Sequence, residues 1–214
     1  KKCADGKAYL VVLLVDSGDL NIYNVTDLER VRSYYVIDRG HDLEDLLLWN
    51  RLCGLDGHMI QAKMLDERLG YVGEITGINA DPINDVLEKG YIPVISTVGC
   101  DKEGNVYNVN ADTAASRIAA ALGAESLISM TDISGILRDK DDVSSLIPTI
   151  RVSEAPKLIE DGVISGGMIP KTQCCIEAIN NGVKKVFIID GRVPHSIIVE
   201  ILTDEGIGTM FIDG

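Results

Sequence analysis

A single lysine follows a pair of glycines in the stretch GVISGGMIPKTQ, which covers residues 162–173. Backbone N–H groups beside Gly166 and Gly167 can approach a phosphate closely, because no side chain stands in the way. Lys171 would then offer a positive charge to a phosphoryl group in transfer. The spacing is not that of the P-loop, G-x-x-x-x-G-K-[ST]. A flexible surface loop with a solvated lysine is the alternative interpretation of the same residues.

Two amides and a carboxylate stand close together in YNVNADTAAS, residues 107–116. Asn108 and Asn110 precede Asp112, which lies near the start of an alanine-rich helical pattern. Asparagine and aspartate are good N-cap residues, so a helix cap explains the group. The functional interpretation is that the amides meet a ligand carboxylate while Asp112 orients a cation. A helix start adds N–H donors and favours anions.

A threonine and an aspartate end an apolar run in MTDISGIL, residues 130–137. A strand that simply leaves the sheet through a Ser-Gly turn explains the pattern. The functional interpretation places Thr131 and Asp132 at the carboxyl edge of a parallel sheet. Ligands collect at that edge in open α/β sheets, so the two residues would contact a nucleotide there.

These candidates lie among short apolar runs and helical patterns that alternate along the chain. The expected strands are residues 8–15, 91–97, 126–132, 185–190 and 208–212. The expected helices are residues 25–52, 111–124, 154–163, 170–183 and 194–206. Continuous Val/Ile runs separated by helices predict an α/β fold, with a parallel sheet that is covered on both faces.

The composition narrows the class of protein. The 214 residues contain 20 Lys+Arg against 33 Asp+Glu, a formal net charge of -13, which argues against a nucleic-acid partner. No apolar run has the length needed to cross a membrane. Five cysteines without CxxC spacing favour reduced thiols in the cytoplasm. The three histidines, His41, His58 and His195, show no metal-ligand spacing.

Seven stretches, taken together, resemble the acetylglutamate kinases of the amino-acid-kinase family. They occur in the order of the family, at residues 70–79, 90–99, 107–115, 122–137, 158–171, 186–196 and 203–210. No single stretch is decisive, but the set is specific. The strings YNVNAD and IDGRVPH favour acetylglutamate kinase over relatives that act on aspartate, glutamate, carbamate or UMP.

The resemblance implies a three-layer α/β/α sandwich with a mainly parallel central sheet, in one domain over residues 1–214. Residues 1–95 would form an acetylglutamate-side lobe, and residues 96–214 a nucleotide-side lobe. The implied reaction transfers the γ-phosphoryl group of ATP, with Mg²⁺, to the side-chain carboxylate of N-acetyl-L-glutamate. This is a step of arginine biosynthesis in the cytoplasm. A carboxylate is already ionised at pH 7, so no general base is needed, and the demand is for groups that offset repulsion between anions.

The resemblance also gives each candidate residue a role. Lys171 matches the family lysine that stabilises the transferring phosphoryl group, and Asp112 matches the aspartate that organises the catalytic lysines. Asn108 matches an asparagine that contacts acetylglutamate. The nucleotide-side positions are Thr131, Asp132, Gly135, Gly166, Gly167 and Met168. A homodimer is expected, and an arginine effector would bind near Glu200, Glu205 and Gly206.

The first third of the chain departs from the family pattern. Members open with a strand ending in K-x-G-G and carry a later strand ending in H-G-G-G-P. Residues 6–20 hold one such strand, with DSGD at its turn. The position of the catalytic lysine falls among Val11 and Val12, and Asn24 replaces an arginine that grips the substrate. The alternative function is therefore a catalytically silent, kinase-like protein that binds nucleotide or arginine. A sibling kinase with another acceptor is a third possibility.

Overall fold

The computed structural model describes residues 49–203 and 206–214. Several sequence-based expectations lie outside these residues: the strand at 8–15, most of the helix at 25–52, Val11, Val12, Asn24 and Glu205. Within the described ranges, no helix combines the length and the apolar character that crossing a bilayer requires.

The described end of the expected 25–52 helix is a strand. Strand β1 (Trp49–Cys53) pairs in parallel with β4 (Ile92–Ser96), from Trp49 opposite Ile92 to Cys53 opposite Ser96. The helical prediction is therefore wrong over these residues. Pairing with a strand some forty residues further along the chain overrides the local pattern, as tertiary contacts often do.

Four short strands close into a barrel that the sequence did not predict. They are β2 (Ile60–Met64), β3 (Val72–Ile78), β5 (Val98–Cys100) and β6 (Val106–Val109), in the order β2-β3-β6-β5. Neighbours alternate between antiparallel pairs, β2/β3 and β5/β6, and parallel pairs, β3/β6 and β2/β5. The helix between β3 and β4 is α2 (Asp81–Glu88). Short 3-10 turns cover Asp56–His58 and Glu67–Leu69.

The second half of the chain forms a four-stranded sheet in the order β7-β9-β10-β8. Pairs β7/β9 and β10/β8 are parallel and β10/β9 is antiparallel, so the sheet is mainly parallel, as expected. The bounds of the strands are Ser126–Thr131 for β7, Thr149–Arg151 for β8, Lys185–Asp190 for β9 and Thr209–Ile212 for β10. A 3-10 turn covers Val143–Ser145.

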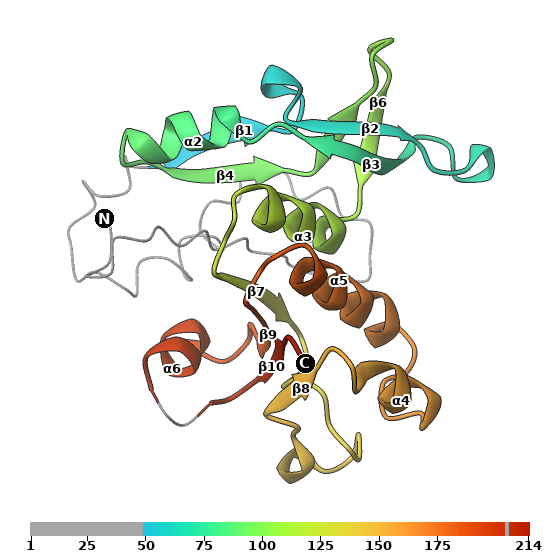
Figure 1. The fold of residues 1–214 in the computed structure, drawn as a ribbon, viewed down its shortest axis with the longest axis vertical. Coiled ribbons are helices and arrows are strands. Elements are labelled where there is room, and N and C mark those ends of the chain that lie inside the picture. Colours follow the sequence, from blue (N-terminus) through green and yellow to red (C-terminus); the bar gives the residue numbers. More distant parts are fainter. Residues whose placement is uncertain (1–48, 204–205) are drawn as a thin grey trace.

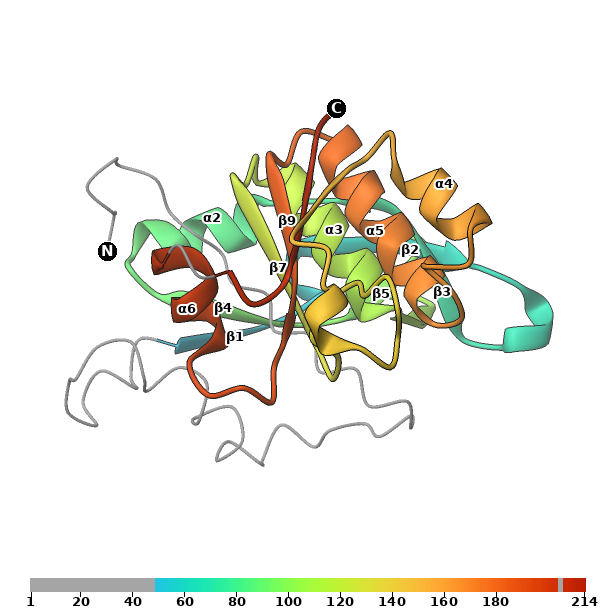
Figure 2. The same cartoon turned by 90° about the horizontal axis from the view of Figure 1, so that it is seen from below.

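Helices cover both faces of this sheet, which confirms the layered α/β architecture (Figures 1 and 2). Residues of α3 and α5 share a core with Leu127, Val186 and Phe211 of the sheet. On the opposite face, Ile197 of α6 packs against Ile128 and the other residues of a separate cluster. The bounds are Ala111–Ala121 for α3, Ala155–Glu160 for α4, Met168–Asn180 for α5 and Ser196–Leu202 for α6.

Helix α3 lies between the barrel and the four-stranded sheet (Figure 1). Ala114 and Ile118 belong to the barrel core, whereas Ala115 and Ala119 belong to the core of the sheet. Each pair is spaced four residues apart and so lies on one side of the helix. The strand groups divide along the chain between β6 and β7, whereas the two lobes expected from the sequence divide at residue 95.

Candidate active site

Two charged side chains from neighbouring helices form a buried ion pair. Lys171 of α5 donates from Nζ to both carboxylate oxygens of Asp112 on α3, at 3.0 Å to Oδ1 and 2.8 Å to Oδ2. The Lys171 side chain is 4% exposed and that of Asp112 is 16% exposed. Lys171 is therefore a buried helical residue, and the alternative of a solvated lysine on a surface loop is wrong.

Helix α3 is capped by Asn110, which leaves Asp112 available for Lys171. The Asn110 Oδ1 accepts a hydrogen bond from the backbone N–H of Thr113 at 3.0 Å. A side-chain acceptor for that N–H is what an N-cap supplies. The sequence allowed two interpretations of these residues, a helix cap or a partner for a cation. In the structure Asn110 is the cap and Asp112 is the partner of the Lys171 cation.

The positions of the pair in their helices favour an anion at this end of the molecule. Both residues lie in the first turn of their helix, where unsatisfied N–H groups carry partial positive charge. A lysine in a first turn opposes the helix dipole, so Lys171 does not contribute favourably to α5 through that dipole. Asp112 offsets the lysine charge, and the N–H groups at a helix start favour an anion such as phosphate.

Four polar residues gather where β7 and β9 end. Thr131 is opposite Asp190 in the parallel register, and the Thr131 hydroxyl donates to Asp132 Oδ1 at 3.3 Å. Arg192 donates to both oxygens of Asp190, at 2.9 Å from Nε and 2.9 Å from Nη2. Asp190 and Arg192 were not predicted as site residues, although both lie in the matched string IDGRVPH. The sequence feature that could have indicated these two residues is an apolar strand that ends in Asp190 and is followed by a glycine and Arg192.

Asp190 gives this edge a pH-dependent contribution to stability. Its hydrogen bonds with Arg192 hold the pKa of the buried Asp190 carboxyl below its usual range. A lowered folded-state pKa stabilises the protein above the unfolded value of about 4, and this contribution is lost as pH falls through the folded pKa. We expect Asp190→Asn to lower the free energy of unfolding by roughly 1–2 kcal/mol at pH 7. Urea denaturation should show the difference shrinking below about pH 4, and a constant difference would contradict the assignment.

The glycine pair lies at the open start of α5. Gly167 is the N-cap residue, and a Cβ added at Gly166 or Gly167 would meet no atom within 4 Å. The neighbouring Met168 instead packs against the core of the four-stranded sheet. The backbone at the two glycines is therefore accessible from outside, as phosphate binding requires.

Gly135 has a packing role in the fold. Its φ of +131° lies in a region that favours glycine, and an added Cβ would stand 2.7 Å from Thr209 Oγ1. The buried Thr209 hydroxyl accepts from the Ile136 N–H and donates to the Ile147 carbonyl, at 2.8 Å in each case. A side chain at Gly135 would displace the Thr209 hydroxyl and disrupt both of these hydrogen bonds.

The remaining sequence-predicted residues lie on β6, on α6 and between α6 and β10. Asn108 is an exposed residue of β6 in the barrel. Glu200 lies on α6, and its Oε2 accepts from the backbone N–H groups of Ile207 at 2.7 Å and Gly208 at 2.9 Å. Gly206 is exposed, with a positive φ of 46°. Glu200 thus links α6 to the residues immediately before β10.

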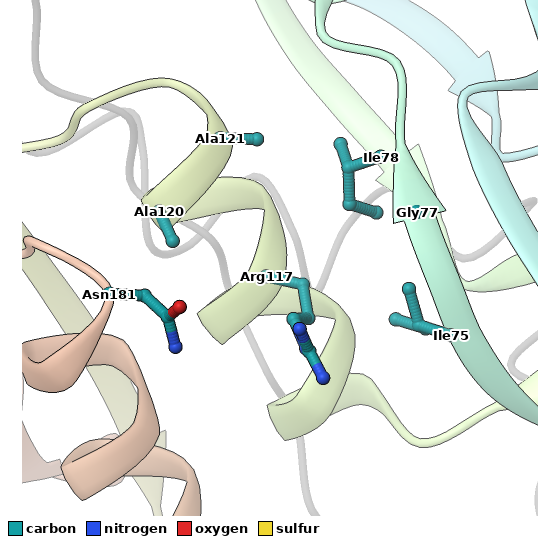
Figure 3. A pocket seen from close by; sticks show the side chains of 7 residues that line it. All are labelled: Ile75, Gly77, Ile78, Arg117, Ala120, Ala121 and Asn181. Atoms are coloured by element: carbon teal, nitrogen blue, oxygen red, sulfur yellow. The ribbon is translucent and has the colours of Figure 1, made fainter.

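A cavity of about 180 Å³ lies toward the other end of α3 (Figure 3). Two elements and the C-cap residue of α5 line it: Ile75, Gly77 and Ile78 from β3, Arg117, Ala120 and Ala121 from α3, and Asn181. The polar Arg117 is already paired, with its Nε 2.8 Å from Glu177 Oε1. No predicted site residue contributes to this cavity, so it is separate from the candidate active site.

Comparison with known proteins places the chain in a family. The profile of the amino acid kinase family matches residues 21–190, and the chain belongs to this family. Among solved structures, the protein smu.665 from Streptococcus mutans UA159 matches with a TM-score of 0.66 and 30% identity, covering 88% of this chain and 73% of that one. The N-acetylglutamate synthase from Neisseria gonorrhoeae, solved with coenzyme A and L-arginine, matches with a TM-score of 0.68 and 25% identity. That match covers 78% of this chain and 38% of the synthase.

Within the family, the similarity is to acetylglutamate kinases, which confirms the resemblance found in the sequence. The acetylglutamate kinase of Brachyspira hyodysenteriae (strain ATCC 49526 / WA1) is 55% identical over 162 residues. The alignment covers 75% of this chain and 56% of that kinase. The chain therefore spans about half the length of the curated relatives that it matches.

Proposed function

We propose that this protein transfers the γ-phosphoryl group of ATP to the side-chain carboxylate of N-acetyl-L-glutamate, in the cytoplasm and as a step of arginine biosynthesis. The product is N-acetyl-glutamyl 5-phosphate. The observation that carries the proposal is the buried Lys171–Asp112 pair at the starts of two helices. Support for the substrate comes from the 55% identity with an acetylglutamate kinase.

The chemistry of the pair suits this reaction. A carboxylate oxygen of the acceptor forms a bond to the γ-phosphorus, and the bond from that phosphorus to the bridging oxygen of ADP breaks. Negative charge spreads over the transferring group, so catalysis rests on positioning and electrostatic stabilisation. Lys171 supplies the positive charge, and Asp112 fixes its direction through two hydrogen bonds. A buried, oriented charge needs no reorganisation during the reaction.

The other predicted residues complete the proposal. The nucleotide contacts Thr131 and Asp132 at the sheet edge and the backbone around Gly166, Gly167 and Met168, with Gly135 supporting the turn. Acetylglutamate contacts Asn108. Residues 1–95 serve the acetylglutamate side, and residues 96–214 serve the nucleotide side. The open backbone at the start of α5 supports the phosphate contacts.

Magnesium would accompany the nucleotide. Among residues 49–203 and 206–214, no group of three or more His, Cys, Asp or Glu side chains could hold a metal ion. Mg²⁺ commonly binds through phosphate oxygens and water with only one or two carboxylates. We therefore assign Mg²⁺ to the ATP phosphates rather than to a site built from the described side chains.

Arginine and a second copy of the chain are the proposed partners. Arginine would act as an effector near Glu200, Glu205 and Gly206, and the chain would form a homodimer. Support for arginine comes from a structural relative that was solved with L-arginine. Light scattering with and without arginine tests both points, and a hexamer would contradict the homodimer.

An assay of the purified 214-residue chain tests the function. With Mg-ATP, ADP formation should depend on N-acetyl-L-glutamate and not on aspartate, glutamate or carbamate, and hydroxylamine should trap the acyl phosphate. If no ADP forms but calorimetry detects nucleotide or arginine binding, the protein is the silent binding protein that the departures near Val11, Val12 and Asn24 suggest. If neither activity nor binding is found, both functions are excluded.

A further inference from the structure

A buried serine interrupts the apolar strand β7. Ser129 is 4% exposed, and its neighbours Ile128 and Met130 belong to the core beneath α6. Side chains alternate between the two faces of a strand, so Ser129 shares the opposite face with Leu127, toward α3 and α5. Most buried side-chain hydroxyls in proteins have a hydrogen-bond partner.

The partner of Ser129 is the carboxylate of the candidate active site. The Ser129 Oγ donates to Asp112 Oδ1 at 3.3 Å, and the same oxygen accepts from Lys171 Nζ at 3.0 Å. The sheet, α3 and α5 are thereby joined through one carboxylate. A carboxylate that accepts donors from two directions is restricted in rotation about its terminal torsion, which is otherwise broad.

We propose that Ser129 is a positioning residue for the phosphoryl transfer proposed above, because its hydroxyl fixes the Asp112 carboxylate that directs Lys171. The two helices that carry the ion pair also carry two other buried hydroxyls. Ser116 lies four residues after Asp112 on α3, and Thr172 follows Lys171 on α5. Both lack a hydrogen-bond partner among the described residues. A buried hydroxyl on these helices therefore does not automatically bind the Asp112 carboxylate. Ser116 serves as the matched control for Ser129, because it is buried but forms no hydrogen bond with Asp112.

The kinetic test compares Ser129→Thr with Ser129→Val, two variants of nearly equal shape of which only the first keeps the hydroxyl. We expect Ser129→Val and Ser129→Ala to lower kcat about tenfold, which is near the lower limit for a hydrogen bond to a charged group. The KM values for ATP and N-acetyl-L-glutamate should stay within about twofold, since binding groups are unchanged. Ser129→Thr should restore most of kcat. Equal kcat values for the Thr and Val variants would overturn the proposal.

A second measurement does not depend on activity. The ¹³C carboxyl signal of Asp112, assigned by its loss in Asp112→Asn, should move in Ser129→Val and remain in place in Ser116→Ala. Thermal denaturation confirms that each variant is folded. An unchanged Asp112 signal in folded Ser129→Val would overturn the proposal. A signal that moves in a chain without kinase activity would support the Ser129–Asp112 link while rejecting the proposed function.

Discussion

Replacing Lys171 by methionine is expected to reduce kcat for N-acetyl-L-glutamate phosphorylation by about 10²–10³-fold, the loss typical of one preorganised electrostatic contact. Methionine keeps much of the length and apolar stem of lysine but removes the charge. The Lys171 side chain lies near the start of α5 and is only 4% exposed. Because the position is buried, a cation from solvent is not expected to take the place of the lost ammonium group. Because the interaction strengthens as charge develops, KM for N-acetyl-L-glutamate should change much less than kcat.

The control for this variant is Lys157→Met on α4. Lys157 is an exposed lysine outside the candidate site, and the substitution should leave kcat unchanged. Steady-state ADP release measures both variants, and circular dichroism shows that both are folded. A Lys171→Met protein whose kcat falls by less than about tenfold would remove Lys171 from the reaction centre.

Replacing Asp112 by alanine is expected to have the largest effect on stability. The variant leaves the Lys171 ammonium buried without its carboxylate, and loss of one partner of a buried pair typically destabilises a protein by about 3–5 kcal/mol. Asp112 is 16% exposed, so partial hydration places the expectation toward the lower end of that range. Urea denaturation at pH 7 gives the change in the free energy of unfolding.

The double variant Asp112→Ala/Lys171→Met separates the pair from other effects. Removing the lysine as well removes the uncompensated charge, so the double variant should be more stable than Asp112→Ala alone. The coupling free energy between the two positions should then amount to about 1–3 kcal/mol. Strictly additive changes in the free energy of unfolding would show that the two side chains do not stabilise each other.

The elements with local signals could be predicted from the sequence. Helix α3 follows an asparagine cap and an alanine-rich pattern, and α5 carries a proline in its first turn and Gly182 just beyond its end. Strands β7 and β9 are six-residue segments with a mainly apolar sequence, and five of the six positions in each are buried. Caps, periodicity and strand burial are properties of a few consecutive residues, so these segments emerged with bounds within a few residues of those observed.

Features that depend on distant partners could not be predicted in the same way. The barrel joins β2 with β5 and β3 with β6, and these short strands carry no signal that names their neighbours. The site shows the same limit. Lys171 and Asp112 were each candidates from the sequence. Asparagine and aspartate are equally favourable N-cap residues, however, so the sequence alone could not assign the cap to Asn110 and the lysine partner to Asp112. The Ser129 hydroxyl on Asp112 depends on the packing of a strand against a helix, which no spacing in the sequence reveals.

The two-sided packing of α3 has a consequence for the cooperativity of unfolding. Ala114 and Ile118 are buried in the core of the barrel, and Ala115 and Ala119 in the core of the four-stranded sheet. The helix therefore contributes side chains to both cores. Detaching the barrel would expose one side of α3, and melting the sheet would expose the other. Loss of structure in either core should weaken the other, so we expect the barrel and the four-stranded sheet to unfold as one cooperative unit.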